Sequence, residues 1–583
     1  MVGPLYDCVG NPLGVVRLTF NNAVTTNPGT IDGKEWGVVE VFQRYLYDQS
    51  GLNQVPIINA HNVRRIPPKT LVRFRGVIHD MRGKEFYQGA FKDGDTWKTN
   101  KYTDGTQNIE LLEGSSHDKR LWERSILHSV TIPGINDWAD ASSEDSIDRY
   151  LASMSIQRDK RTRAEVGTIC EDVSNDADDI PSPKKLKEES SYLSIPSSSA
   201  SHRTELANGN FPVEPDPFSC IIKVYDLPDH DYKLNEIYEF IGVLELCSNS
   251  PDISASDVDE SMDPVSPYYN IPRIHCIIMR KFYFKDLITH PPNDEPNVRS
   301  IRDIRNSLLN HLTNVLGNDD LTAQFMLLHL LSSVNMHREG IAIGKLGLNI
   351  TSFNKESASV FGKPLAATLK SLLPISQTIR LTVDFLNARS VVPSKDYDAD
   401  RIIQGSLNLT RGSHLTFDET AMEPGALKST GVANVRLLTN IVKTQTAEYD
   451  FVYYTLSIPL DVQVLVLSEG KSSILPADVE IPFRPRGVGA VEAVEERTLN
   501  TWRWYLANMR TLPYEIESDV EKVVQDDFVA ARQADRSFQV EDLSTWLNLG
   551  RLLTASFGET TLSLDHWQSV KELQRLLKLR FLA

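Results

Sequence analysis

The pattern of apolar and polar positions changes several times along the 583 residues of the chain. Between residues 33 and 49 the apolar side chains recur at about helical spacing, which predicts an amphipathic helix. From residue 68 they alternate with polar ones, which is typical of a strand. The stretch DMRGKE at 80–85 then predicts a turn, and FYQGAF at 86–91 predicts the returning strand.

Three later segments carry the same strand pattern, at 218–226, 238–246 and 271–282. Short strands with a glycine inside one of them predict a five-stranded Greek-key barrel, most economically of the oligonucleotide/oligosaccharide-binding (OB) type. Such a barrel can bind single-stranded nucleic acid through stacking aromatic side chains. The candidates are Phe74, Phe86 and Tyr87, although packing in the core explains these aromatics better.

Two segments interrupt the expected barrel. Residues 138–215 are rich in Ser, Asp, Glu and Lys and poor in large apolar residues. Such a segment cannot bury enough apolar surface to offset its chain entropy, so we expect a disordered insert. A second insert, 248–264, holds five acidic residues and no basic residue, and it predicts a solvated acidic loop.

From about residue 297 the pattern becomes that of an α/β region. Two helices are predicted first, one ended by Gly317 and the next opened by Asp319 and Asp320. Strand and helix patterns then alternate, which predicts a mostly parallel sheet with helices on both faces. Strands are expected at 344–351, 379–386, 413–419, 454–460 and 462–470, helices at 356–373 and 431–443, and four more helical segments over 491–583.

Composition narrows the class of protein. A net charge of −17 and a pI near 5.3 disfavour general nucleic-acid binding, because affinity for DNA comes mostly from Lys and Arg, and they favour protein partners. No apolar run approaches the ~20 residues that span a bilayer, and the first residues lack the layout of a signal peptide. The five cysteines are scattered and never spaced CxxC, which argues against a disulfide framework and a zinc knuckle.

The stretch HLTFDE at 414–419 carries the main candidate for chemistry. Asp418 and Glu419 end an expected strand, where nucleotide hydrolases present the carboxylates that handle Mg²⁺ and water. A site of this kind needs a G-x-x-x-x-G-K-[ST] loop upstream, because bare backbone N–H groups must wrap the phosphates. The decisive question is whether the chain has that loop.

No segment of the sequence supplies it. GIAIGKL is one residue short and has Leu346 in place of the hydroxyl, and FGKPL has Pro364 there. The strand LGLNIT is followed by SFNKESAS, which contains no glycine. We therefore expect an inactive site without a cofactor, in which Asp418 and Glu419 are a remnant or a structural pair. Nucleotide binding without a recognisable loop stays open.

Other catalytic patterns are equally weak. RGVGAVE at 486–492 follows a segment with two prolines and predicts a helix-entry turn rather than a dinucleotide fingerprint. HExxH and GxSxG do not occur, and the 13 histidines form no cluster with ligand spacing. No catalytic residue and no metal site are expected.

The expected disordered insert carries two short basic runs. Such runs on an exposed tether are typical of nuclear-import signals, although a merely solvated tether explains them too. Ser182, which precedes Pro183, matches a proline-directed kinase site whose phosphate would partly cancel the neighbouring charge. The candidate import residues are Lys160, Arg161, Arg163, Lys184, Lys185 and Lys187.

Four stretches, taken in order, resemble a known family. YDCVGNPLGVVRLTF, PKTLVRFRGVIHDMRGKEFYQGAF, HLTFDET and VLVLSEGKSSILPADVEIPF are similar to the minichromosome maintenance (MCM) complex-binding protein family, and the first resembles the plant members. The resemblance covers nearly the whole ordered chain. It implies a non-catalytic relative of the MCM helicase subunits, which have an OB-containing N-terminal part, a AAA+ core and a helical end.

The resemblance also implies where a helicase subunit's site would lie. Residues 405–420 occupy the place of the Walker B strand, with Asp418 and Glu419 as a degenerate Walker B-like pair, and LVLSEG at 465–470 occupies the strand-end sensor position. The chain departs from the helicase pattern because it lacks the phosphate loop and the four zinc-binding cysteines. Both losses weaken any transfer of ATPase or DNA-gripping function.

The expected fold is multidomain α/β plus β. It combines a split OB-like barrel, a degenerate AAA+-like α/β domain without a phosphate loop, and a helical C-terminal domain. The expected parts are a helical cap (1–60), the barrel (61–137 and 216–290), the insert (138–215), the AAA+-like domain (291–484) and a lid-like helical domain (485–583).

The resemblance implies a protein that binds MCM subunits in place of one of them. It would act in DNA replication, in MCM assembly and unloading from chromatin, and in sister-chromatid cohesion during the cell cycle. The expected location is the nucleus, with a cytoplasmic pool allowed, and chromatin association would be indirect; no membrane contact and no enzymatic activity are expected. Two alternatives stay open, an active AAA+ ATPase and an OB-type protein that binds single-stranded nucleic acid.

Overall fold

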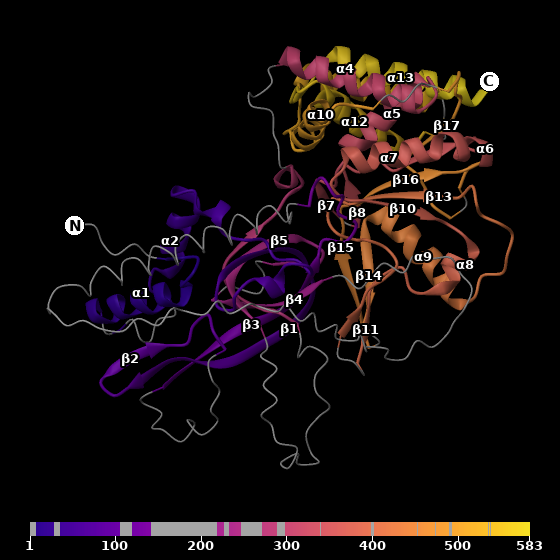
Figure 1. Cartoon of the computed structure of the whole chain (residues 1–583). Coiled ribbons are helices and arrows are strands. Elements are labelled where there is room, and N and C mark those ends of the chain that lie inside the picture. The colour runs from indigo at the N-terminus through magenta and orange to yellow at the C-terminus, as the bar shows by residue number, and fades with distance from the viewer. Residues whose placement is uncertain are drawn as a thin grey trace, which may run out of the picture. The chain divides into compact units, whose positions relative to one another are not determined.

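The computed structural model covers most of the chain (Figure 1). It describes residues 7–27, 29, 35–104, 119–140, 218–226, 232–246, 271–288, 298–338, 340–397, 401–451, 453–472, 474–488, 493–534, 536 and 538–582. All of these fall in one unit, made of residues 1–147 and 218–583. The expected insert from residue 141 on and the expected acidic loop lie outside the described residues. The domain boundaries expected from the sequence stay a prediction.

Two helices form the N-terminal part. α1 spans Pro12–Thr26, and α2 spans Val38–Gln43 before it continues as a π-helical turn over Arg44–Asp48. The amphipathic helix expected here is therefore confirmed as α2 and its continuation. Periodicity misses α1 because its buried side chains include the adjacent Val15 and Val16, which do not form a narrow apolar stripe.

Five strands of the next region close a ring. β1 pairs with β3, β3 with β4, β4 with β6, β6 with β5, and β5 pairs back with β1. Only the β4–β6 pair in this ring is parallel. The short β2 pairs antiparallel with the last residues of β1. The three later strand patterns are confirmed as β4, β5 and β6. The strands are β1 Leu71–Asp93, β2 Thr96–Thr99, β3 Lys119–Thr131, β4 Ser219–Tyr225, β5 Ile237–Glu245 and β6 Arg273–Lys281.

The turn expected at DMRGKE is wrong, because β1 runs through this stretch as one strand. The pairing of β1 with β3 shifts in register between Ile78 and Asp80 and again between Met81 and Lys84, and Gly83 has a φ of +87°. The glycine and its polar neighbours therefore form a bulge rather than a hairpin. A bulge bends a strand, which allows the first part of β1 to pair with β5 and the later part with β3.

The three aromatic candidates of the ring face different surroundings. Phe74 is fully buried and stacks on Phe240 with ring centroids 6.4 Å apart. Tyr87 is buried against Tyr225, with ring centroids 5.4 Å apart. Phe86 is 75% exposed. Core packing therefore accounts for Phe74 and Tyr87, and Phe86 faces solvent.

Five parallel strands form the sheet of the α/β region, in the order β10-β13-β16-β9-β17. Along β16, Leu465 and Leu467 belong to one apolar cluster and Val464 and Val466 to another, because successive side chains point to opposite faces. α5 packs in the first cluster and α9 in the second, so the expected helix-covered parallel sheet is confirmed. The strands are β9 Leu348–Thr351, β10 Ser376–Arg380, β13 His414–Asp418, β16 Gln463–Leu467 and β17 Val479–Pro482.

The helices of this region match the sequence pattern. Gly317, with a φ of +66°, follows the end of α4, and the side chain of Asp319 caps α5 by accepting a hydrogen bond from the backbone N–H of Thr322. The helices are α4 Val298–Val315, α5 Asp320–Leu331, α6 Lys355–Ser357, which continues through a π-helical turn into α7 Lys363–Leu372, and α9 Ser429–Thr444.

One expected strand is wrong in its second half. Residues 379–386 divide between the end of β10 and a helix, α8 (Val383–Ala388). The hydroxyl of Thr382 caps this helix by accepting a hydrogen bond from the backbone N–H of Phe385 at 3.1 Å. The cap and an acidic residue in the first turn favour the helix more strongly than the run of apolar residues favours a strand.

A four-stranded sheet in the order β12-β11-β14-β15 was not expected from the sequence. The strand expected at 454–460 is β15, and it belongs to this sheet rather than to the parallel one. The strands are β11 Ser394–Asp396, β12 Arg401–Ile403, β14 Thr446–Asp450 and β15 Thr455–Pro459.

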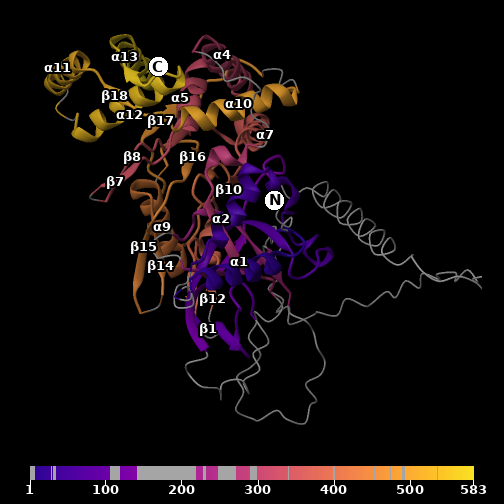
Figure 2. The ribbon, with the colours of Figure 1, turned by 90° about the vertical axis from the view of Figure 1, so that its left-hand side faces the viewer.

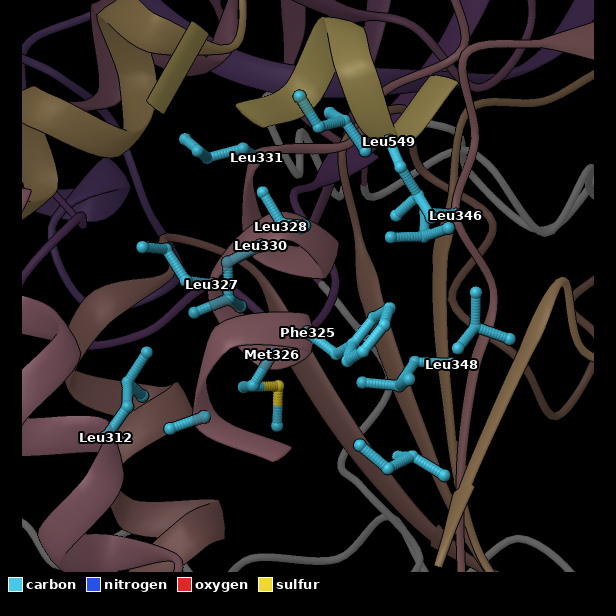
Figure 3. Packing of buried hydrophobic residues seen from close by; sticks show 14 of the residues in the cluster. Leu312, Phe325, Met326, Leu327, Leu328, Leu330, Leu331, Leu346, Leu348 and Leu549 are labelled. Atoms are coloured by element: carbon cyan, nitrogen blue, oxygen red, sulfur yellow. The ribbon is translucent and has the colours of Figure 1, made fainter. Parts of the chain in front are cut away.

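Four C-terminal helices are present, as expected: α10 Glu496–Met509, α11 Ser518–Ala534, α12 Val540–Ser556 and α13 Leu564–Leu582. Leu549 of α12 lies in one cluster with Leu312 of α4, Phe325 of α5 and Leu348 of β9 (Figure 3). Figure 2 shows these helices gathered beside α4 and α5, so they share a core with the α/β region. No helix in the described part of the chain is long and apolar enough to cross a membrane.

Candidate functional site

The carboxyl ends of the parallel strands form the edge where open α/β sheets bind ligands. Asp418 ends β13 and lies in register with Leu467, which ends β16. Leu467 in turn lies in register with Ile350 of β9. The expected carboxylates, the sensor segment and the turn that would hold phosphates therefore follow three neighbouring strands.

Both carboxylates accept hydrogen bonds from nearby groups of the protein. The Oδ1 atom of Asp418 accepts hydrogen bonds from the backbone N–H and the hydroxyl of Thr420, at 3.0 and 2.6 Å. Glu419 accepts one from the hydroxyl of Ser472 at 2.6 Å, and burial raises the pKa of its carboxyl above the ordinary value. These bonds fit the structural role that the sequence allowed for the pair.

The turn after β9 is filled by the protein itself. The side chain of Phe353 is fully buried, and its ring centroid lies 5.2 Å from that of Phe483. The backbone N–H groups of Ser352 and Phe353 donate to the carbonyls of Glu469 and Ser468, at 3.1 and 2.9 Å. A phosphate loop needs free N–H groups and an open cradle, whereas here these two N–H groups are bonded and the ring of Phe353 is packed inside the turn.

The two glycine-containing segments that were weighed as phosphate loops belong to other structures. Lys345 lies before β9 and pairs with Asp478 at 2.6 Å. Gly362 lies inside a helical stretch with a φ of −64°, and Lys363 begins α7. Neither lysine follows a glycine-rich turn at the carboxyl edge.

The closed β ring contains a partly buried cluster that sequence spacing did not predict. Asp104, Glu245 and His275 have ligand atoms within 4.8 Å of one another, a spacing that could hold a metal ion. Lys223, Arg124 and Arg273 already pair with Asp104. Burial raises the pKa of Asp104, but His275, Lys223 and Arg124 outweigh it and hold that pKa well below the usual value. The cluster is therefore a neutralised ion network, and its residues are too far apart in sequence to form a motif.

A pair of histidines is buried beneath the amino ends of the parallel strands. The Nε2 atoms of His329 and His414 lie 3.0 Å apart, and the Nδ1 atom of His329 lies 2.7 Å from the carbonyl oxygen of Leu346. Burial lowers the pKa of His329 to about 4, and burial together with His329 lowers the pKa of His414 well below its ordinary value. Both imidazoles are therefore neutral at pH 7.

The candidate residues in the insert cannot be placed in the same way. Ser182 and the six candidate import residues lie outside the described residues. The roles expected for them stay predictions.

By its fold, the chain is a multidomain α/β protein. It has a closed β ring and a parallel sheet, and the turn after β9 of that sheet is filled by a buried aromatic side chain. A family model described as mini-chromosome maintenance replisome factor matches residues 42–581. The chain belongs to this family, which confirms the resemblance found in its sequence.

Three relatives named mini-chromosome maintenance complex-binding protein match almost the entire chain. The one from Arabidopsis thaliana is 43% identical over 596 residues and is matched over the full length of both chains. The one from Salmo salar is 32% identical, covering 99% of this chain and 97% of its own length, and the one from Homo sapiens is 30% identical, covering 98% and 97%. The extent of the plant match agrees with the plant-type N-terminal stretch.

Proposed function

We propose that this chain is a non-catalytic protein that binds MCM helicase subunits in DNA replication. The relatives that match its whole length carry the name of an MCM complex-binding protein. The observation that carries the non-catalytic part is the turn after β9, where Phe353 is buried and two backbone N–H groups bond to carbonyls of residues 468 and 469. A protein can shift assembly by binding one state of a partner more tightly than another, without chemistry.

The fold interpretation behind this proposal is a relative of a helicase subunit. The closed five-stranded ring supports an OB-like barrel, and the parallel sheet with strand order β10-β13-β16-β9-β17 supports a degenerate AAA+-like domain. The C-terminal helices would then form its lid-like part. A subunit-like fold keeps the surfaces that dock on neighbouring subunits, and the filled turn removes hydrolysis.

In the cell, the proposed protein helps MCM assembly and unloading from chromatin and contributes to sister-chromatid cohesion. It acts in the nucleus through the basic runs at 158–163 and 181–187, and phosphorylation of Ser182 weakens import by reducing their charge. Chromatin association is indirect, through MCM. Scoring the nuclear share of the chain after replacing Lys184, Lys185 and Lys187 by Gln tests this part.

The binding proposal is tested with the full-length chain as bait in nuclear extract, followed by detection of each MCM subunit. We expect several subunits to be recovered and one to be consistently absent, as for a protein that takes the place of that subunit. Recovery of no MCM subunit contradicts the proposal. Recovery of all subunits in equal amounts contradicts the replacement of one subunit but not binding.

Two other functions are distinguished by ligand binding. Stoichiometric MgATP on the purified chain would favour an active ATPase. Salt-sensitive retention of single-stranded DNA that Phe86→Ala abolishes would favour an OB-type nucleic-acid binder, since Phe86 is the aromatic candidate of the ring that faces solvent.

A further inference from the structure

A large cavity lies at the amino ends of the parallel strands, on the side of the sheet opposite to Asp418. Its volume is about 1240 Å³. Its walls come from the barrel segment 281–287, the hairpin of β7 (Met336–Arg338) and β8 (Ile341–Ile343), the segments that precede the parallel strands, and the helices α10 and α12. It exceeds the range of about 300–1,000 Å³ typical of small-molecule pockets.

A buried cation in this wall has no hydrogen-bond partner for one of its donors. Arg510 follows the last residue of α10 and is 7% exposed, and its Nη1 atom is buried without a hydrogen-bond partner among the described residues. Its guanidinium carbon lies 4.5 Å from the ring centroid of Phe284, which also lines the cavity. Burial lowers the pKa of Arg510, and Asp461 opposes this effect. Buried charges are normally paired, so this donor lacks an acceptor that a ligand can supply.

A second buried donor in the same wall also lacks a hydrogen-bond partner among the described residues. The hydroxyl of Tyr514 is buried and has no hydrogen-bond partner among the described residues. Burial raises the pKa of Tyr514 to about 12, so the phenol is protonated and can donate. Arg551 is close enough to affect that pKa, and its own guanidinium donates to the carbonyl of Gly344 and to the side chain of Asn548 rather than to a carboxylate.

Some of the other charges of the wall are paired within it, whereas Lys285, Arg338, Lys443 and Glu541 form no ion pair with the described residues. Lys345 pairs with Asp478, Lys281 with Glu236, and Arg411 contacts both Glu236 and Asp461. What is left over is cationic, because Arg510 and Arg551 form no ion pair with the described residues. The unpaired positive charge of the wall favours binding of an anion, although the chain as a whole carries a net charge of −17.

The exposed part of the cavity wall includes large apolar side chains. Six large side chains that line it are between 38% and 65% exposed: Tyr283, Met336, Ile341, Ile343, Ile516 and Val540. A cluster of exposed apolar side chains around a pocket marks an interaction site. A free inorganic anion would bond to Arg510 and leave this rim in water, whereas a polypeptide with large apolar side chains would cover it.

We propose that this cavity binds a short segment of a partner protein in which an aspartate or glutamate lies between large apolar side chains. The donor atoms of Arg510 and Tyr514 are buried in the unbound chain, so the carboxylate accepts hydrogen bonds from them once both side chains turn towards the cavity. The apolar side chains cover the rim around Ile341. The inference deepens the proposed function by assigning it a docking surface, and it rests on that function only for the identity of the partner.

The test places a photo-crosslinking residue at the mouth of the full-length chain, as Ile341→p-benzoylphenylalanine. The protein is irradiated in nuclear extract, and the attached peptide is sequenced by mass spectrometry. We expect one predominant peptide with an acidic residue flanked by apolar ones, and we expect Arg510→Met to reduce its yield by at least about tenfold, as for loss of one partner of a buried charge pair. Arg436→Met is the matched control, because Arg436 is exposed and pairs with Glu448 outside the cavity.

The outcomes separate this inference from the proposed function. Such a peptide from an MCM subunit supports both, and one from another protein supports the docking surface but not its use for MCM. No attached peptide, a peptide without an acidic residue, or a yield that Arg510→Met leaves unchanged overturns the inference, even if the bait still recovers MCM subunits. Thermal stabilisation by inorganic phosphate that depends on Arg510, without a crosslink, also overturns it and assigns the site to a free anion.

The control for misfolding is the stability of the variants. Loss of the crosslink in Arg510→Met supports the inference only where the melting temperature is unchanged or higher than that of the parent chain. Tyr514→Phe, which removes one oxygen atom, provides a second variant and is expected to reduce the yield by a smaller factor.

Discussion

The two edges of the parallel sheet differ in how their polar groups are satisfied. At the carboxyl edge, Asp418 and Glu419 accept hydrogen bonds from neighbouring hydroxyls, and the turn after β9 closes on the carbonyls of residues 468 and 469. At the amino edge, the Nη1 atom of Arg510 and the hydroxyl of Tyr514 are buried beside a cavity and have no hydrogen-bond partner among the described residues. The edge where the fold would normally place a ligand is closed, whereas the opposite edge has donors that lack acceptors.

Position in a fold and capacity to bind a ligand are therefore separate properties. Strand order and strand ends point to the carboxyl edge, by analogy with related folds. The unsatisfied donors point to the amino edge, through the free energy that each buried group loses without a partner. The predictions below act on one edge at a time, in order of decreasing expected effect.

The largest effect is expected from emptying the turn at the carboxyl edge. Phe353→Ala removes a fully buried ring and should lower the free energy of unfolding by about 3–5 kcal/mol, measured by denaturant titration of the full-length chain. Phe86→Ala is the control, because Phe86 is 75% exposed and its loss should change that free energy by less than about 1 kcal/mol. Equal effects of the two substitutions would mean that the turn is not filled by a core residue.

Acid is expected to weaken the amino edge through its buried histidines. The folded-state pKa of His329 is about 4, below the ordinary value of 6.5, so the unfolded chain takes up the proton first as the pH falls. The stability from this residue is complete above pH 6.5 and is lost towards pH 4, by up to about 3 kcal/mol. Unfolding measured between pH 7.5 and 4 should show this decline, and His329→Asn should make it shallower. His61→Gln is the control, because His61 is exposed. The same dependence of stability on pH in His61→Gln and His329→Asn would mean that His329 does not cause the decline.

A smaller effect is expected from the carboxylates. Asp418→Asn with Glu419→Gln weakens short hydrogen bonds to hydroxyls and should lower the free energy of unfolding by about 1 kcal/mol. Recovery of MCM subunits should not change, and MgATP should not shift the melting temperature of the parent chain or the variant. A shift by MgATP in the parent chain that the double variant loses would show that the carboxyl edge still binds nucleotide.

The smallest effect on stability is expected from Arg510→Met. This substitution replaces an unsatisfied buried cation by an apolar side chain of similar length, so the free energy of unfolding should be unchanged or slightly higher, within about 1 kcal/mol. Differential scanning calorimetry of the full-length chain measures it beside Arg436→Met, an exposed ion-pair control. A loss of several kcal/mol would mean that Arg510 is a structural residue and would remove the contrast between the two edges.

Local patterns in the sequence were sufficient for much of the fold. Asp319 as the cap of α5, the glycine after α4 and the continuous apolar run of β16 are each signals within a few neighbouring positions. DMRGKE was misinterpreted because a glycine with polar neighbours serves a hairpin and a bulge equally well. The difference between them depends on how β3 and β5 pair with β1, and the paired residues lie about 30 to 170 positions further along the chain.

The candidate sites also differ in whether local sequence motifs could reveal them. The sequence located Asp418 and Glu419 at a strand end and showed that the phosphate loop was missing, because both are local motifs. The cavity wall was not predictable, since Phe284, Arg510 and Arg551 come from separate elements and meet only in the folded chain. The ion network of Asp104 and His275 escaped for the same reason.

The bonded turn after β9 also limits how this chain could change over evolutionary time. A phosphate loop at this place would need new glycines, a lysine and a hydroxyl residue, and also the release of the bonds that Ser352 and Phe353 make to the end of β16. Replacing Phe353 by a glycine would remove a buried ring before any contact with a phosphate was gained. Selection for a stable chain therefore opposes the first steps towards a phosphate loop here.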